Sequence, residues 1–217
     1  MNDTLIPDPV HEMSKMGQPE PKPRFTVDEY LEMERKSEDR HIYLDGEIFA
    51  MAGESQSHGR VTVNLVKITA TQLEGGPCEP YTKDVKVRSG PVPMPGQSRK
   101  GLFSYPDIVV VCGEAEYHDA HEDVLLNPKV IFEALSPSTE AFVRGVKFNR
   151  LSAHNPSLSD YILVSQDKPQ IEHFSRAADG GWSYQCYTGL DTLLRVPSID
   201  CDLKLAEVYA RVKFDGE

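Results

Sequence analysis

The stretch Val130-Ile131-Phe132-Glu133-Ala134-Leu135-Ser136-Pro137-Ser138-Thr139 decides how this chain is interpreted. Its first six residues are mostly apolar and partly β-branched, which is typical of a short buried strand, and the Ser-Pro cluster marks the end of that strand. Glu133 interrupts the apolar run. Because a buried carboxylate is costly unless a cation or hydrogen-bond donors compensate it, we expect Glu133 to have a partner elsewhere in the fold.

A second run carries a carboxylate of the same kind. The sequence Ser104-Tyr105-Pro106-Asp107-Ile108-Val109-Val110-Val111 predicts another short buried strand, with Asp107 directly after the proline. Neighbouring strands lie about 4.8 Å apart, so Asp107 and Glu133 can share one divalent ion if their register matches. The pair therefore indicates Mg²⁺ or Mn²⁺ chemistry, in which oxygen ligands hold the ion against a phosphate.

Length and composition favour one globular unit. The chain has 217 residues, of which 39% are hydrophobic, and no run approaches the length of a membrane span. Five prolines within residues 1–23 predict a flexible N-terminal arm, and we expect a single domain over residues 24–212.

Charge and cysteine content narrow the functional classes. The net charge of −11 argues against generic nucleic-acid binding, although a local basic groove would suffice for a nuclease. The cysteines show no Cys-x-x-Cys spacing, which argues against a zinc site and against a disulfide scaffold. We expect reduced thiols in a cytoplasmic protein at all four positions, Cys78, Cys112, Cys186 and Cys201.

The order of predicted elements gives the fold class. Thr26 and Glu29 form a capping box that starts a helix, and Asp45-Gly46 predicts a hairpin turn. Apolar spacing predicts an amphipathic helix over 57–73. Later expectations are a helix over 138–154, a strand over 161–165, a hairpin over 170–187, a short strand over 193–196 and a C-terminal helix over 205–212. This order predicts an α/β or α+β mixed sheet with helices on its faces.

A cationic side chain is expected beside the two acids, because it can orient a water or stabilise charge on a phosphate. The position two residues after Glu133 holds Leu135, which cannot do this. Lys147 can, if the helix after Ser138 folds back across the sheet.

Four motifs resemble the Uma-type family of restriction-endonuclease-like proteins, within the PD-(D/E)XK nuclease superfamily. They are Tyr43-Leu44-Asp45-Gly46-Glu47, Ser57-His58, Tyr105-Pro106-Asp107 and Phe132-Glu133-Ala134-Leu135-Ser136-Pro137-Ser138-Thr139. The resemblance runs from about Phe25 to Tyr209. It implies a restriction-endonuclease-like fold: a mixed central sheet of four or five strands, flanked by helices, with αβββαβ core order.

The resemblance also implies roles for particular residues. Asp107 and Glu133 match the two acids of the motif, Lys147 matches a lysine that family members place on the following helix, and Glu47 matches an N-terminal metal ligand. The chain departs from the family pattern at Val143, where an aspartate is common, and at Ile162, where an aromatic residue is common. Further candidates for supporting the site or touching the substrate are His58, Asp84, Lys83, Lys86 and Arg88.

These observations lead to one main hypothesis and two rivals. The main one is a Mg²⁺-dependent endonuclease acting on DNA, with a homodimer expected because two-fold symmetry suits the cutting of a duplex. The first rival is an inactive protein of the same fold that binds nucleic acid or a partner protein. The second is a metal-dependent hydrolase of another phosphoester.

Overall fold

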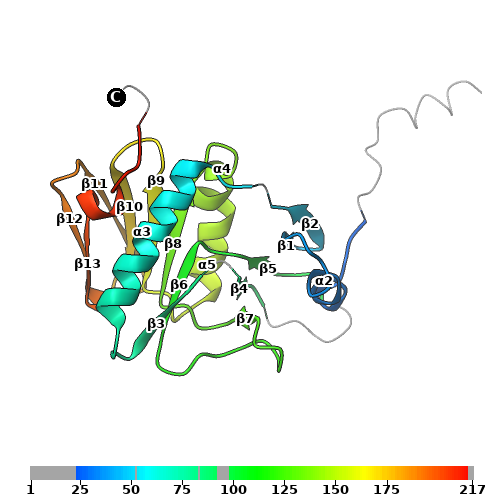
Figure 1. Ribbon diagram of the computed structural model, residues 1–217. Helices are drawn as coiled ribbons and strands as arrows, with labels where there is room; N and C mark the ends of the chain where they lie inside the picture. Colours follow the sequence, from blue (N-terminus) through cyan, green and yellow to red (C-terminus); the bar gives the residue numbers. More distant parts are fainter. Residues whose placement is uncertain (1–22, 52, 83, 92–97, 215–217) are drawn as a thin grey trace, which may run out of the picture.

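A computed structural model describes residues 23–51, 53–82, 84–91 and 98–214 (Figure 1). The predicted N-terminal arm lies outside these ranges except for its last residue, and the limits of the predicted single domain stay a prediction. No helix in the described part of the chain is both long and apolar enough to cross a membrane.

The central sheet has six strands in the order β11-β10-β9-β8-β6-β3. Parallel pairing joins β8 to β9, whereas the other neighbours are antiparallel, so the sheet is mixed. The strand bounds are β3 (Cys78–Thr82), β6 (Ile108–Cys112), β8 (Val130–Leu135), β9 (Asp160–Ser165), β10 (Gln170–Arg176) and β11 (Trp182–Thr188).

Helices cover both faces of this sheet (Figure 1). Helix α3 (Gln56–Leu73) lies on one face, and a continuous helical stretch lies on the other, made of α4 (Glu140–Phe142), the π-helix η1 (Val143–Lys147) and α5 (Phe148–His154). The order α3, β3, β6, β8, α4–α5, β9 reproduces the predicted αβββαβ core. The predicted fold class is confirmed.

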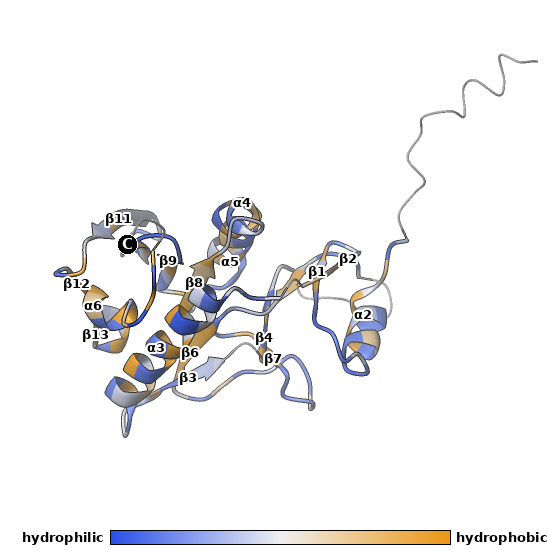
Figure 2. Cartoon of the chain, turned by 45° about the horizontal axis from the view of Figure 1, so that its top comes forward, coloured by the Kyte–Doolittle hydropathy of each residue, from blue (hydrophilic) through white to orange (hydrophobic). Residues whose placement is uncertain are grey.

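The spacing of apolar residues explains why α3 packs as it does. Its buried side chains recur on one side of the helix, and hydrophilic and hydrophobic residues alternate along it (Figure 2). The buried apolar members are Val61, Leu65, Ile68 and Leu73.

A second sheet of five strands lies beside the first, in the order β2-β1-β5-β4-β7. The predicted capping box starts α2 (Val27–Glu34), and the predicted Asp45-Gly46 turn joins β1 to β2. Both turn residues have positive φ, which this hairpin turn requires. The strand bounds are β1 (His41–Leu44), β2 (Glu47–Ala50), β4 (Lys86–Ser89), β5 (Leu102–Ser104) and β7 (Val124–Leu125).

The C-terminal part adds the hairpin β12 (Leu193–Val196) and β13 (Cys201–Lys204), with the 3₁₀ turn η2 (Pro197–Ile199) between them. The helix expected over 205–212 is shorter, because α6 spans only Leu205–Val208. The next residue, Tyr209, exchanges hydrogen bonds with the backbone of Gln170, and Arg211 has a positive φ that a helix cannot contain.

The strand expected to open at Asp107 is present as β6, whereas reading the preceding Ser104 into the same run was wrong. Strand β5 ends at Ser104 in the second sheet, and β6 begins at Ile108 in the central sheet. Pro106 lies between them and has no backbone N–H to donate to a ladder. The chain crosses between sheets here, which places Asp107 at the junction.

The expectation of four reduced cysteines was also wrong. Cys78 and Cys112 form a disulfide, while Cys186 and Cys201 are free thiols. Cys78 and Cys112 lie directly opposite each other on antiparallel β3 and β6, with Cα atoms 3.9 Å apart. Their separation of 34 residues gave no local signal of this pairing. The cysteines therefore no longer support the predicted cytoplasmic localisation.

Candidate metal centre and active site

A cavity of about 480 Å³ opens where β8 and β9 end. Its walls come from segments that are far apart in the sequence, among them the end of β2, the start of α3, the turn between β5 and β6, the loop after β8 and the helical stretch that follows it. The carboxyl ends of parallel strands in a helix-flanked sheet are a common place for ligands to bind.

Asp107 lies on the cavity wall, directly before β6, and is mostly buried. Its Oδ2 accepts a hydrogen bond from the backbone N–H of Ala134 at 2.7 Å. Its Oδ1 lies 2.9 Å from Nε2 of His58. Two contacts from different elements therefore fix the direction of this carboxylate.

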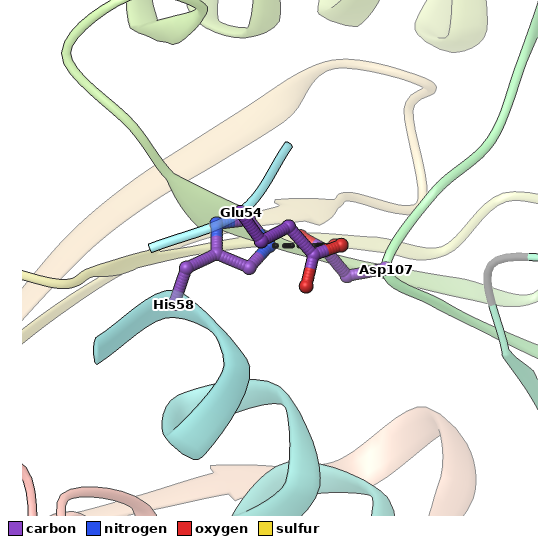
Figure 3. Close-up of side chains that lie close together, drawn as sticks. All are labelled: Glu54, His58 and Asp107. Carbon is purple, nitrogen blue, oxygen red and sulfur yellow. Dashed lines mark hydrogen bonds and ion pairs between the residues drawn. The ribbon is translucent and has the colours of Figure 1, made fainter. Parts of the chain in front are cut away.

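His58 and Glu54 reach Asp107 from the start of α3 (Figure 3). Ser55 caps this helix, because its Oγ accepts a hydrogen bond from the backbone N–H of His58 at 3.1 Å. Glu54 precedes the cap, and its Oε1 lies 3.9 Å from Nε2 of His58. One donor atom from each of Glu54, His58 and Asp107 lies within 4.8 Å of the others.

Glu133 faces the same cavity from β8 and forms an ion pair with Lys147, whose Nζ lies 2.5 Å from Oε1. Burial raises the pKa of Glu133 to about 7, since the positive charge of Lys147 offsets the loss of water only in part and the negative charge of Asp107 adds to it.

Lys147 ends the π-helix η1, on the buried side of the helical stretch. Val143, Lys147 and Leu151 are all buried and recur every four residues, so they lie on one side of this stretch. The carbonyl of Val143 accepts the backbone N–H of Phe148 and also the hydroxyl of Tyr161 at 3.1 Å. The buried Tyr161 on β9 thus supports the turn that carries the lysine.

The donor set fits a divalent cation. Two carboxylates are the ligands that Mg²⁺ and Mn²⁺ prefer, and the imidazole of His58 adds a nitrogen donor that suits a transition metal better than Mg²⁺. Glu133 lines the same cavity and would add negative charge there. The cavity can therefore hold a cation next to a buried ammonium group.

Comparison with known proteins identifies the family. Residues 27–206 match the model of the Uma2 family, described as "Putative restriction endonuclease". The chain belongs to the Uma2 family. Two relatives come from Synechocystis sp. (strain PCC 6803). The uncharacterized protein slr1290 is 34% identical over 89% of this chain and 96% of its own length, and the uncharacterized protein sll1609 is 27% identical over 73% and 84%.

A solved structure supports the fold. The crystal structure from Anabaena variabilis described as "a putative nuclease belonging to DUF820" matches with a TM-score of 0.69, covering 87% of this chain and 99% of that chain. The two are 15% identical, so the likeness concerns the fold alone. The predicted resemblance is confirmed, and membership of the Uma2 family indicates a nuclease-like protein.

The structure brings four of the predicted residues of this Uma2 protein to one cavity: Asp107, Glu133, Lys147 and His58. It does not bring Glu47 there. Glu47 begins β2, and the cavity is lined by the other end of that strand, at Ala50. The acid that reaches Asp107 from the N-terminal part of the chain is Glu54.

Apart from Lys83, the remaining candidates lie away from the cavity. Lys83 falls outside the described residues. Asp84 is exposed and forms an ion pair with Arg40. Lys86 and Arg88 were expected to touch a phosphate backbone, but both side chains are mostly buried. Lys86 pairs with Asp123 at 2.9 Å, and Arg88 donates to the carbonyl of Pro91 at 2.9 Å.

Sequence reasoning missed Glu54. One signal was present in the sequence: Glu54 is an acid directly before a helix-capping serine and four residues before His58. That spacing puts the side chains of Glu54 and His58 on one side of the chain. Glu54 is exposed, and an exposed glutamate near a helix start is ordinary, so the signal becomes specific only with Asp107 beside it.

Proposed function

We propose that this Uma2 protein is an endonuclease that uses Mg²⁺ or Mn²⁺ to hydrolyse phosphodiester bonds in DNA. The observation that carries the proposal is that one cavity contains the cation-binding set Glu54, His58 and Asp107 together with the buried pair Glu133 and Lys147. Buried acids and a lysine in a cleft are costly to a fold, which favours a functional reason for them.

Asp107 is the central ligand in this proposal, because the Ala134 N–H holds one of its oxygens and leaves the other directed at His58 and Glu54. Glu54 and His58 would complete the set. When bound, the cation would polarise the scissile phosphate and lower the pKa of a water.

Lys147 has two tasks. It offsets the charge of Glu133, which would otherwise be a buried carboxylate without a compensating cation. Its position also lets it stabilise negative charge that develops on the phosphate. Lys147 therefore stands in for the lysine that is absent at Leu135.

The test is cleavage of plasmid and oligonucleotide DNA by the full chain with Mg²⁺ or Mn²⁺. Asp107→Asn and Glu133→Gln should each lower the cleavage rate by about 100-fold or more, as expected when a charge that organises the reaction is lost. Asp191→Asn, at an exposed loop position, is the matched control and should cut at the rate of the unaltered protein. Circular dichroism would verify folding. Equal rates in all four proteins would reject this site.

A binding role without catalysis is the second candidate. The observation that favours it is that the polar groups of the site already pair with one another, His58 with Asp107 and Lys147 with Glu133. Calorimetry separates the two, since the binding module predicts no Mn²⁺ binding that depends on Asp107. RNA and small phosphoesters as additional substrates test the hydrolase alternative, and light scattering tests the proposed homodimer.

A further inference from the structure

Gln166 lies on the cavity wall and has no role in the site described so far. It directly follows β9, and its side chain is 7% exposed. Leu135 and Ser165 are paired at the ends of parallel β8 and β9, so the chain leaves the sheet at Ser136 and Gln166 side by side. This places Gln166 at the same sheet edge as the loop after Glu133.

One end of the Gln166 amide is held in place. The hydroxyl of Ser55 donates to its Oε1 at 2.5 Å. The same hydroxyl oxygen accepts the N–H of His58 at 3.1 Å, so the helix cap and the amide are linked. This contact fixes which way the amide faces.

The other end of the amide is available to a ligand. Nε2 of Gln166 makes no hydrogen bond with any of the described residues, and it keeps some access to the cavity. An amide N–H donates well to an anionic oxygen, and it brings no charge of its own to a site that also binds a cation. Lys147, the ammonium group of the cavity, is already engaged by Glu133.

We propose that Gln166 is a substrate-contacting residue, whose amide N–H group donates to a non-bridging oxygen of a phosphodiester held in this cavity. The inference rests on the proposed function, because it assigns a phosphodiester to the same site. The rival explanation is that Gln166 only holds the Ser55 cap, and through it Glu54 and His58. The two explanations differ in what a substitution changes: phosphodiester affinity in the first, cation affinity in the second.

The probe is the dinucleotide TpT, which carries one phosphodiester and no terminal phosphate. It is titrated into the full Mn²⁺-loaded chain and followed by the paramagnetic relaxation of its phosphorus, while Mn²⁺ affinity is measured separately by calorimetry. The variants are Gln166→Met, which keeps the side-chain length and removes the donors, and Gln166→Glu, which adds a negative charge. Gln185→Met and Gln185→Glu, at an exposed position on β11, are the matched controls.

Gln166→Met should weaken TpT binding about tenfold with Mn²⁺ affinity unchanged, and Gln166→Glu should weaken it further. Both Gln185 variants should bind TpT as the unaltered protein does. Unchanged TpT affinity in Gln166→Met, or a parallel loss of Mn²⁺ and TpT affinity, would overturn the inference. Failure of the unaltered protein to bind TpT would overturn it as well.

The experiments distinguish a failure of the proposed endonuclease function from a failure of the Gln166 inference. If TpT binding depends on Gln166 but no nucleic acid is cut, the endonuclease activity is rejected and the phosphodiester contact stands. If DNA is cut in a manner that depends on Asp107 while Gln166→Met binds TpT normally, the Gln166 contact is rejected and the endonuclease activity stands.

Discussion

Glu133→Gln tests the energetic cost of the buried carboxylate. Burial raises the pKa of Glu133 from 4.5 to about 7 in the folded protein. A group whose folded pKa is raised favours folding below its unfolded pKa, and that contribution is lost as the pH rises through the folded pKa. The shift spans about 2.5 pH units, and at about 1.4 kcal/mol per unit the ionisation of Glu133 lowers the free energy of unfolding by about 3 kcal/mol between pH 4.5 and pH 7.5.

Glutamine removes this pH dependence. It also leaves Lys147 without its counter-charge, which costs stability by an amount that is similar at every pH in this range. The expected result is therefore a change in slope: the free energy of unfolding of Glu133→Gln, measured relative to the unaltered protein, should rise by about 3 kcal/mol from pH 4.5 to pH 7.5.

Urea unfolding at five pH values in EDTA measures this difference. Glu79→Gln is the matched control, because Glu79 is an exposed strand carboxylate on β3, and it should show no such slope. A difference between Glu133→Gln and the unaltered protein that stays constant over the whole pH range would refute the reasoning, since it would mean that Glu133 ionises as it does in water.

Mn²⁺ should reduce the slope in the unaltered protein. A cation favours the ionised carboxylate and competes with the proton, so Mn²⁺ affinity should increase as the pH rises toward 7 and level off above it. The Glu133→Gln protein should lack this part of the pH dependence.

Three further predictions concern other parts of the molecule. Glu54→Gln should lower Mn²⁺ affinity at least tenfold in calorimetry at pH 7.5, because one of the carboxylates in the candidate set is lost. Asp123→Asn should destabilise the fold by about 2 kcal/mol at pH 7 in urea unfolding. Although burial opposes it, hydrogen bonds from Arg35 and Lys86 hold the pKa of Asp123 well below its usual value, so this difference should persist to pH 4 and shrink in stronger acid. Cys78→Ser should lower the free energy of unfolding by about 4 kcal/mol, the loop-closure value for a 34-residue separation, and a reducing agent should have the same effect on the unaltered protein only.

Local patterns predicted two acids of the candidate site because each of them breaks a rule of its surroundings. Glu133 interrupts an apolar strand, and Asp107 follows a proline directly before another one, so both stand out in a single sequence. The hairpin turn at Asp45 and the capped start of α2 were predictable for the same reason, since local chemistry alone decides them.

Long-range partners were not predictable in this way. Lys86 alternates with apolar residues as an exposed strand lysine would. Its side chain is nevertheless buried, because its ammonium group donates a hydrogen bond to Asp123, 37 residues away in the sequence. The break at Pro106 was visible in the sequence, yet only the pairing of β5 with β1 and β4 shows that the break is a crossing between two sheets. The disulfide depends in the same way on the register of β3 and β6.

Lys147 was predictable from the sequence only in part. Its chemistry was predictable, since Leu135 leaves the site without a cation, but its contact with Glu133 depends on how the helical stretch that contains the π-helix packs on the sheet. Because the hydroxyl of Tyr161 bonds the carbonyl of Val143 within that turn, Tyr161→Phe should loosen the lysine without touching the cavity. The expected signature is a Glu133 pKa that moves further upward as Lys147 becomes a weaker partner, followed by carboxyl NMR. A Glu133 pKa unchanged by Tyr161→Phe would show that the turn holds the lysine by itself.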